Sequence, residues 1–217
     1  MEAKSSSAEA NPNNRRGRNA LQEEQRRRTR SILIEAAIAI FGERGYLETS
    51  IEHVLVRAGV SRAAFYTHFD GKLDLVCAIA EDFQPTWRPV FEKLAGLEAP
   101  TLDALAAWSK QHMALHRDHS IVCGLLAQVA TLEETLHRQL AGQRDALIRR
   151  LGTRYPAFAR AAQDPDALLR ARVLLGHIDQ ICFSITHHRL PDPEHGAAQL
   201  IAEALDHFLN GRDSRRG

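Results

Sequence analysis

Apolar residues recur along most of this 217-residue chain at the three- and four-residue spacing of an amphipathic helix. No run alternates apolar and polar residues with the period of two that predicts a half-buried strand. Capping residues, prolines and glycines separate the helical runs. We therefore expect an all-α protein. The predicted helices lie at about 24–44, 50–58, 61–69, 72–94, 101–117, 120–129, 131–152, 165–189 and 193–210, with a break near 84–87 where Pro85 and Pro89 occur.

The stretch from Ser50 to Phe69 predicts two short helices joined by a tight turn. Ser50 and Ser61 each stand where a side chain caps a helix N-terminus. Gly59, between them, can adopt the positive φ that lets a chain leave a helix sharply. Such a pair is the sequence form of a helix-turn-helix, whose second helix lies in the major groove of DNA.

The second of these helices has an apolar and a polar side. Phe65 and Phe69 are four residues apart and predict its buried side. Small residues and hydrogen-bond donors form the outward side, namely Arg62, Ala63, Ala64, Tyr66, Thr67 and His68. The alternative is an ordinary helical hairpin whose polar side faces water. We favour DNA binding because several independent signals coincide.

Charge distribution supports DNA binding although net charge does not. The formal net charge is only +1. Between Arg15 and Arg30, however, seven arginines accompany two glutamates. Such a basic arm is typical of segments that bind phosphate backbone, and the alternative is a solubilising tail. Residues 1–22 lack apolar periodicity, and we expect them to be a disordered arm.

At this point the sequence resembles a family. Residues 28–75, above all AGVSRAAFYTHFDGKLDLV, are similar to the N-terminal domain of TetR-type transcriptional repressors. The shared features are a Gly-Val-Ser turn, an aromatic-Tyr-x-His-Phe helix and a lysine three residues after the last Phe. The chain departs from the family at Leu55, where a small alanine is usual, so the two motif helices should lie slightly farther apart.

The resemblance implies a domain organisation and a set of partners. Residues 23–71 would be the helix-turn-helix domain, and residues 72–217 a helical effector-binding and dimerisation domain. The last two long helices would pair with those of a second subunit, and this homodimer would offer two half-sites to a palindromic operator. A small molecule in the body would release the protein from DNA. Repression is itself an implication of the resemblance.

Positions in the motif predict individual DNA contacts. Thr49 and Ser50 would offer hydroxyls and helix N-terminal N–H groups to a phosphate. Arg62 is the candidate for a guanine contact, and Ala63 or Ala64 for a thymine methyl. By the resemblance, Tyr66 and His68 would contact the backbone and Lys72 would neutralise a phosphate. The complete predicted set is Thr49, Ser50, Ser61, Arg62, Ala63, Ala64, Tyr66, Thr67, His68 and Lys72.

The predicted helix at 101–117 carries histidines beside its apolar stripe, at His112 and His116, with His119 beyond it. They are core or helix-edge residues, or hydrogen-bonding groups of a ligand cavity, or metal ligands of a metal-responsive repressor. The sequence assigns no metal and no cofactor. We expect a mostly apolar effector in contact with Trp87, Trp108, His112, Met113, His116, His177 and Gln180.

Several function classes have no support in the sequence. It lacks a glycine-rich phosphate loop, a nucleophile elbow and an HExxH motif, so we expect no enzyme. The three cysteines are widely spaced in apolar patterns and predict reduced thiols. Without a long apolar run or a signal-peptide pattern, a cytoplasmic protein is expected. A helical protein without DNA affinity would leave the outward side of the second motif helix and the basic arm unexplained.

Overall fold

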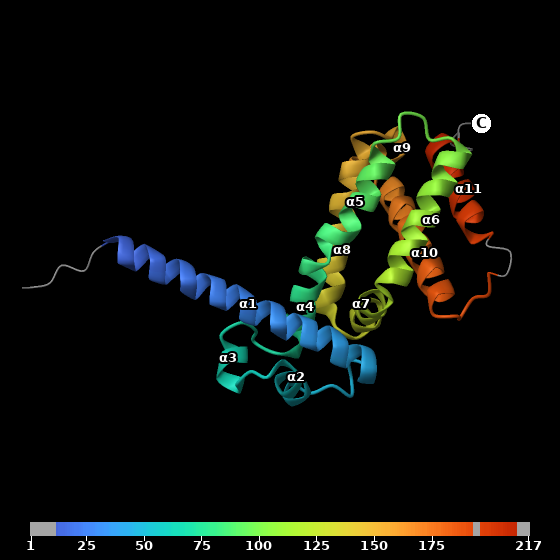
Figure 1. The fold of residues 1–217 in the computed structure, drawn as a ribbon. Helices are drawn as coiled ribbons and strands as arrows, with labels where there is room; N and C mark the ends of the chain where they lie inside the picture. The colour runs from blue at the N-terminus through green and yellow to red at the C-terminus, as the bar shows by residue number, and fades with distance from the viewer. Residues whose placement is uncertain (1–11, 193–195, 212–217) are drawn as a thin grey trace, which may run out of the picture.

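The computed structural model describes residues 12–192 and 196–211, with side chains from residue 19 onward. Within these ranges the chain forms eleven α-helices, one short 3₁₀ helix and no β-strand, which confirms the all-α class. A small domain of three helices is followed by a larger helical body (Figure 1). In the described part of the chain, no helix is both long enough and apolar enough to span a membrane.

Three helices form the small domain: α1 (Pro12–Arg44), α2 (Ile51–Ala58) and α3 (Arg62–Tyr66). The second half of α1 buries the predicted apolar stripe against α2 and α4, in the same core that contains Phe65 of α3. Gly45 then ends the helix with a φ of +78° and donates its N–H to the carbonyl of Phe41 at 2.8 Å. The local signals of this domain are therefore confirmed.

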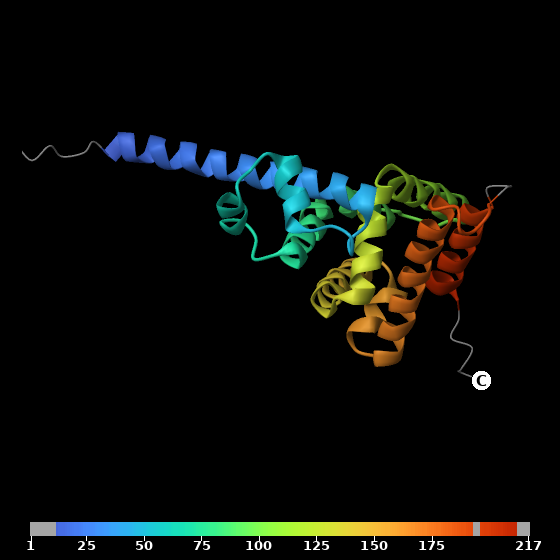
Figure 2. The same cartoon turned by 90° about the horizontal axis from the view of Figure 1, so that it is seen from below.

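The first helix begins earlier than predicted. It starts at Pro12 instead of residue 24, and its N-terminal part projects away from the rest of the molecule (Figure 2). Residues 19–28 are exposed, so no core requires an apolar stripe there. Arginine, glutamine, glutamate and alanine are good helix formers. A segment of this composition can therefore be helical without an apolar stripe. Of the expected disordered arm, residues 12–22 are helical and residues 1–11 lie outside the described residues.

Two helices connect the domain to the body. α4 (Lys72–Asp82) and α5 (Gln84–Ala95) meet at Phe83, which confirms the predicted break. Pro85 lies in the first turn of α5, where a missing N–H costs nothing. Pro89 lies inside α5 and removes one of its backbone hydrogen bonds.

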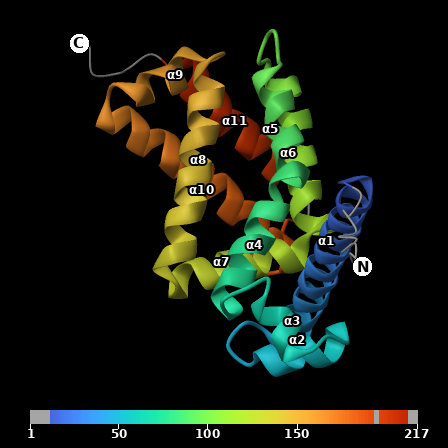
Figure 3. The same cartoon turned by 90° about the vertical axis from the view of Figure 1, so that its left-hand side faces the viewer.

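The body contains α6 (Leu102–Asp118), α7 (Ser120–Leu132), α8 (Glu134–Gly152), α10 (Pro165–Thr186) and α11 (Ala197–Asn210). Thr101 and Asp164 cap α6 and α10 as predicted. α11 packs along α6, and α8 lies beside α5 and α10 (Figure 3). The helix predicted at 131–152 begins later, at Glu134, because Thr131 and Leu132 still belong to α7 and the Thr131 hydroxyl donates to the carbonyl of Gln128.

The sequence does not predict two short elements in the connection between α8 and α10. α9 (Pro156–Ala159) and a 3₁₀ helix at Arg160–Ala162 follow α8 and pack on it. Four- and three-residue helices are too short to leave a periodic pattern.

The last helix is predicted to start at Pro193, but residues 193–195 lie outside the described residues and Gly196 precedes its first residue.

The small domain and the body share part of a core. Apolar side chains of α7 and α8, including Leu125 and Leu136, belong to the same cluster as α1, α2 and α4. The Tyr46 hydroxyl also donates to Glu133, at the junction of α7 and α8, at 3.1 Å. Burial, and then this hydrogen bond, raise the pKa of Tyr46 to about 12. A conformational change around α7 could therefore be transmitted to the small domain through direct contacts.

Candidate DNA-binding surface and central cavity

The N-terminal caps of α2 and α3, and the turn between these helices, have the geometry that the sequence predicts. Ser50 accepts a hydrogen bond from the N–H of His53 at 3.4 Å, and its own N–H donates to His53 Nδ1 at 3.2 Å. Gly59 ends α2 with a φ of +66°. Ser61 accepts from the N–H of Ala64 at 3.1 Å and so caps α3.

Helix α3 buries one side and exposes the other. Phe65 and Phe69 are in the core, with their ring centroids 5.6 Å apart. Arg62, Ala63, Tyr66 and Thr67 are exposed, while Ala64 and His68 are half-buried. A short helix anchored by two phenylalanines thus presents a polar, donor-rich side to solvent, as a major-groove helix must.

Arg62, the predicted guanine contact, is already paired in the absence of DNA. Its guanidinium forms an ion pair with the Glu52 carboxylate in the first turn of α2. Both side chains are well exposed, at 61% and 54%. Exposed pairs contribute only about 0–1 kcal/mol, so Arg62 can exchange this partner for a base.

Two predicted phosphate contacts have different surroundings from those expected. Thr49 is only 1% exposed and its hydroxyl donates to the carbonyl of Gly45 at 2.7 Å. The expectation that this hydroxyl is presented to DNA is therefore wrong, because Thr49 closes the turn after α1. The Ser50 hydroxyl is exposed but accepts the capping bond described above.

Lys72 is also engaged within the protein. Its ammonium donates to the carbonyls of Tyr46 and Thr49 at 2.8 and 2.9 Å, and lies 4.1 Å from the centroid of the Tyr46 ring. An ammonium has three donor hydrogens, so one is left for a phosphate. The DNA contact of Lys72 stays a prediction, and the structure adds a second role in fixing the loop between α1 and α2.

Arginines of α1 lie beside the end of α3. The Arg30 guanidinium is 5.8 Å from the centroid of the Phe69 ring. Burial lowers the pKa of His68, and the charges of Arg26 and Arg30 lower it further. The exposed Arg26, Arg27 and Arg28 continue along the same helix. The basic run seen in the sequence is therefore next to the end of α3, a placement that apolar periodicity could not predict.

A cavity of about 350 Å³ lies in the body between α4, α5, α6, α7, α8 and α10. Its wall is mainly apolar and aromatic, with one polar region. The apolar part includes Phe83, Trp87, Phe91, Leu126, Leu147 and Leu175. The polar part comprises His112, His116, Gln143, Arg144, Asp179 and Gln180. Cavities of this size and character bind small organic molecules in other proteins.

Four of the seven predicted effector contacts line this cavity: Trp87, His112, His116 and Gln180. Trp108 packs behind the wall, stacked on His112 at a centroid distance of 5.2 Å, and donates to the carbonyl of Val90. Met113 packs into the body core instead. His177 is exposed on the outer side of α10, so its predicted position in the cavity is wrong. Ile178, the next residue, takes the inward position.

Asp179 is the centre of the polar region. Its Oδ1 lies 3.1 Å from His112 Nε2 and 3.8 Å from His116 Nε2, and its Oδ2 accepts from Arg144 at 2.9 Å. Burial favours the neutral acid, but the two histidines and Arg144 outweigh it and hold the pKa of Asp179 well below its usual range. Burial also opposes the charged form of His116, yet hydrogen bonds with Asp179 and Cys123 raise its pKa to about 9.

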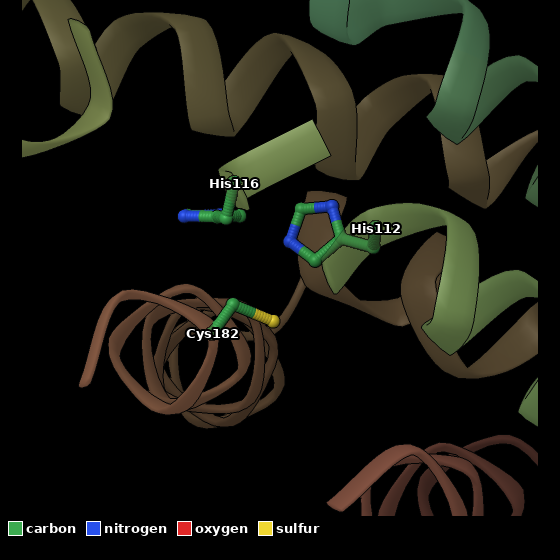
Figure 4. Close-up of side chains that lie close together, drawn as sticks. All are labelled: His112, His116 and Cys182. Carbon is green, nitrogen blue, oxygen red and sulfur yellow. The ribbon is translucent and has the colours of Figure 1, made fainter. Parts of the chain in front are cut away.

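His112, His116 and Cys182 lie together at this end of the cavity (Figure 4). One potential ligand atom from each falls within 4.8 Å of the others. His119, expected from the sequence to join the two histidines, lies instead at the junction of α6 and α7, against the Phe83 ring. The helix ends at Asp118, and this turns His119 away from the other two.

Comparison with known proteins supports a regulatory domain at the N-terminus. The model of the family described as "Bacterial regulatory proteins, tetR family" matches residues 33–79. The HTH-type transcriptional regulator TtgR of Pseudomonas putida is 38% identical over 63 residues, 29% of this chain and 30% of that protein. The HTH-type transcriptional activator FasR of Mycolicibacterium smegmatis is 40% identical over 68 residues, 31% of this chain and 29% of that protein. The alignments span about a third of each relative.

Solved structures resemble most of the chain. A TetR-like transcriptional regulator from Rhodococcus sp. RHA1 has a TM-score of 0.62 at 18% identity, covering 85% of this chain and 97% of that one. The regulator FadR from Bacillus subtilis, solved in complex with stearoyl-CoA, has a TM-score of 0.61 at 16% identity, covering 84% and 98%. At these identities the likeness concerns the fold. Residues 33–79 are therefore similar to the family described as "Bacterial regulatory proteins, tetR family", and the fold of the chain resembles that of a TetR-like regulator.

Proposed function

We propose that this protein is a sequence-specific DNA-binding transcriptional regulator that acts as a homodimer and responds to a small molecule bound in its body. The observation that carries the proposal is the exposed side of α3, with Arg62, Tyr66 and Thr67, beside the arginines of α1. Helix α3 would enter the major groove and α1 would add phosphate contacts. The names of the relatives as transcriptional regulators support this function over an enzymatic one.

A homodimer follows from the geometry of DNA and from the surface of the body. One helix-turn-helix contacts only a few base pairs, and two-fold pairing supplies a second half-site. On α10, Leu169 and Val173 are exposed at 59% and 47%, four residues apart, and Leu200 on α11 is also exposed. These unpartnered apolar side chains support the last two long helices as the dimer interface.

The effector would occupy the central cavity. Its apolar and aromatic wall supports a mostly apolar molecule, and the similar Bacillus subtilis regulator was solved with a ligand that has a long acyl chain. The ligand would act by binding better to a conformation whose recognition helices no longer match one face of DNA. α7 lines the cavity and packs on α1, so it offers a direct mechanical route between the two sites.

The test is fluorescence anisotropy of the purified protein on the DNA immediately upstream of its own gene, with a shuffled control across a salt series. Preference for the native DNA, with affinity that falls as salt rises, is the expected result. Arg62→Ala should cost about 1–3 kcal/mol on the native site and relax preference at one base pair. Tyr66→Ala should weaken binding to the native DNA. The proposal would be contradicted if the upstream DNA, every other promoter region of the genome and their shuffled controls all bound with equal affinity.

A further inference from the structure

Helix α6 and helix α10 bring three metal-ligating side chains into the core of the body. His112 and His116 are four residues apart on one face of α6 and are 2% and 8% exposed. Cys182 on α10 is 0% exposed, and one potential ligand atom of each residue lies within 4.8 Å of the others. Asp179 precedes Cys182 by three residues on the same face of α10, and its Oδ1 faces both imidazoles.

The imidazoles have a hydrogen-bonding requirement that the protein does not meet. Nδ1 of His112 and Nδ1 of His116 are buried without a hydrogen-bond partner. A buried polar atom without a partner costs about 1–3 kcal/mol, so the protein alone does not satisfy either ring fully. Asp179 Oδ1 faces Nε2 of both rings, so an ion shared by Asp179 and the histidines would bind through Nε2 and leave the Nδ1 atoms unchanged.

The contacts with Asp179 do not account for the whole cluster. The carboxylate occupies only one nitrogen of each ring, and Arg144 takes its second oxygen. Cys182 is absent from the cavity wall, whereas both histidines and Asp179 line it. An organic ligand in the cavity would therefore meet the histidines without reaching the thiol. A single ion between α6 and α10 can contact all of them.

We propose that His112, His116 and Cys182 bind a zinc-class divalent transition-metal ion, with the Asp179 carboxylate as the fourth ligand. Two imidazoles, one thiolate and one carboxylate form a donor set that suits tetrahedral Zn²⁺ or Co²⁺ and disfavours Mg²⁺ and Ca²⁺. The Cys182 thiol would release its proton to the solvent as the sulfur bonds to the metal. Bonds of about 2.0–2.3 Å require the histidine and cysteine side chains to approach one another by roughly an ångström. The Asp179 carboxylate, which lies outside the group of atoms within 4.8 Å of one another, would have to move farther.

Arg144 would support this site without binding the ion. Its contact with Oδ2 of Asp179 leaves Oδ1 toward the histidines. Hydrogen bonds of this kind orient a ligating carboxylate and tune its affinity for the metal. Since the ion would cross-link α6 to α10, its binding should stabilise the body. The inference concerns the body alone and does not depend on DNA binding.

The experiment uses the untagged full-length chain, stripped with a chelator and titrated with Co²⁺ and then with Zn²⁺. We expect one ion per chain, visible bands of tetrahedral Co²⁺, and a near-ultraviolet band from thiolate-to-cobalt charge transfer that Zn²⁺ abolishes by competition. Zn²⁺ should also raise the melting temperature. Cys182→Ala should lose the charge-transfer band, and His112→Gln or His116→Gln should lose tight binding. Asp179→Asn should lower affinity by about 10-fold or more, since loss of a charged ligand should cost at least as much as loss of an outer hydrogen-bond partner.

Matched controls are present in the same chain. Cys77→Ala removes a free thiol from α4, and His119→Ala removes the neighbouring histidine that the cluster excludes, so both should keep the cobalt spectrum. If Cys182→Ala does not fold, the unaltered protein still gives a test, because Zn²⁺ should slow alkylation of Cys182 and not of Cys77. Absence of stoichiometric binding, a charge-transfer band that survives Cys182→Ala, or Cys182 alkylation unaffected by Zn²⁺ would each overturn the site.

Discussion

Arg62 of helix α3 forms an ion pair with Glu52 of helix α2. The side chain expected to contact a guanine is thus held by a carboxylate of its own domain when DNA is absent. Glu52 also places a negative charge on the surface that, by the proposed function, would approach phosphates. Both effects oppose DNA binding, and both reside in one exposed residue.

Glu52→Gln is therefore expected to strengthen DNA binding. Loss of an exposed ion pair, worth about 0.2–1 kcal/mol, predicts about 1.4- to 5-fold higher affinity, measured by anisotropy at fixed salt. Glu43→Gln is the control, because it removes the same charge from the Glu43–Arg57 pair of the same domain. An equal gain with Glu43→Gln would mean that overall charge, and not release of Arg62, causes the effect.

Lys72→Met should affect stability and DNA binding together. The substitution keeps an apolar stem but removes the ammonium that donates to the carbonyls of Tyr46 and Thr49. Two charge-assisted bonds in a half-buried loop predict a loss of about 1–3 kcal/mol in the free energy of unfolding, measured by urea denaturation. Below the melting transition, binding should weaken on all DNA sequences alike, and its dependence on salt should become flatter.

Lys93→Met provides the comparison, because Lys93 donates only to the exposed Gln111 side chain. It should leave both the urea midpoint and the DNA affinity close to those of the unaltered protein. A Lys72→Met protein with normal stability and weak DNA binding would show that Lys72 acts on phosphate alone.

The parts of the fold that the sequence predicts best are those determined by neighbouring residues. Ser50, Gly59 and Ser61 cap, end and restart helices through contacts within four residues, and each behaves as predicted. Helix α1 shows the limit of apolar periodicity, because its exposed N-terminal part needs only good helix formers.

The cavity depends on residues that are distant in the sequence. His112 meets Asp179 across 67 positions, and Arg144 reaches the same carboxylate across 35. Periodicity indicates that His112 and His116 face inward, but it gives no means of choosing their partner. Thr49 illustrates the same limit within the small domain, since its burial depends on how the turn after α1 folds back on Gly45.

Gly59→Ala should destabilise the protein through the backbone alone. A Cβ at Gly59 would meet no atom within 4 Å, but the φ of +66° is unfavourable for any L side chain. We expect a loss of about 1–2 kcal/mol. Gly142→Ala is the matched control, because its Cβ is equally free of contacts but lies within helix α8. That variant should gain about 0.5–1 kcal/mol, and equal urea midpoints for the two variants would contradict the argument.

The double substitution Leu169→Glu and Val173→Glu should separate the proposed dimer into monomers. These side chains are exposed one turn apart on α10, so charges there cost little in the isolated chain and much in an apolar interface. Sedimentation velocity should show the smaller species, while circular dichroism stays unchanged. DNA affinity should fall because each monomer reaches only one half-site.

Val56→Glu is the control for that experiment. Val56 is also an exposed apolar residue, but it lies on α2, far along the chain from the proposed interface. Its substitution should leave the sedimentation coefficient of the dimer intact. If the α10 double variant still sediments as a dimer, the interface lies on another face. The unaltered protein could instead be a monomer in solution, of which two copies bind one palindrome. That result would place dimerisation on the DNA, where the two half-sites bring the bodies together.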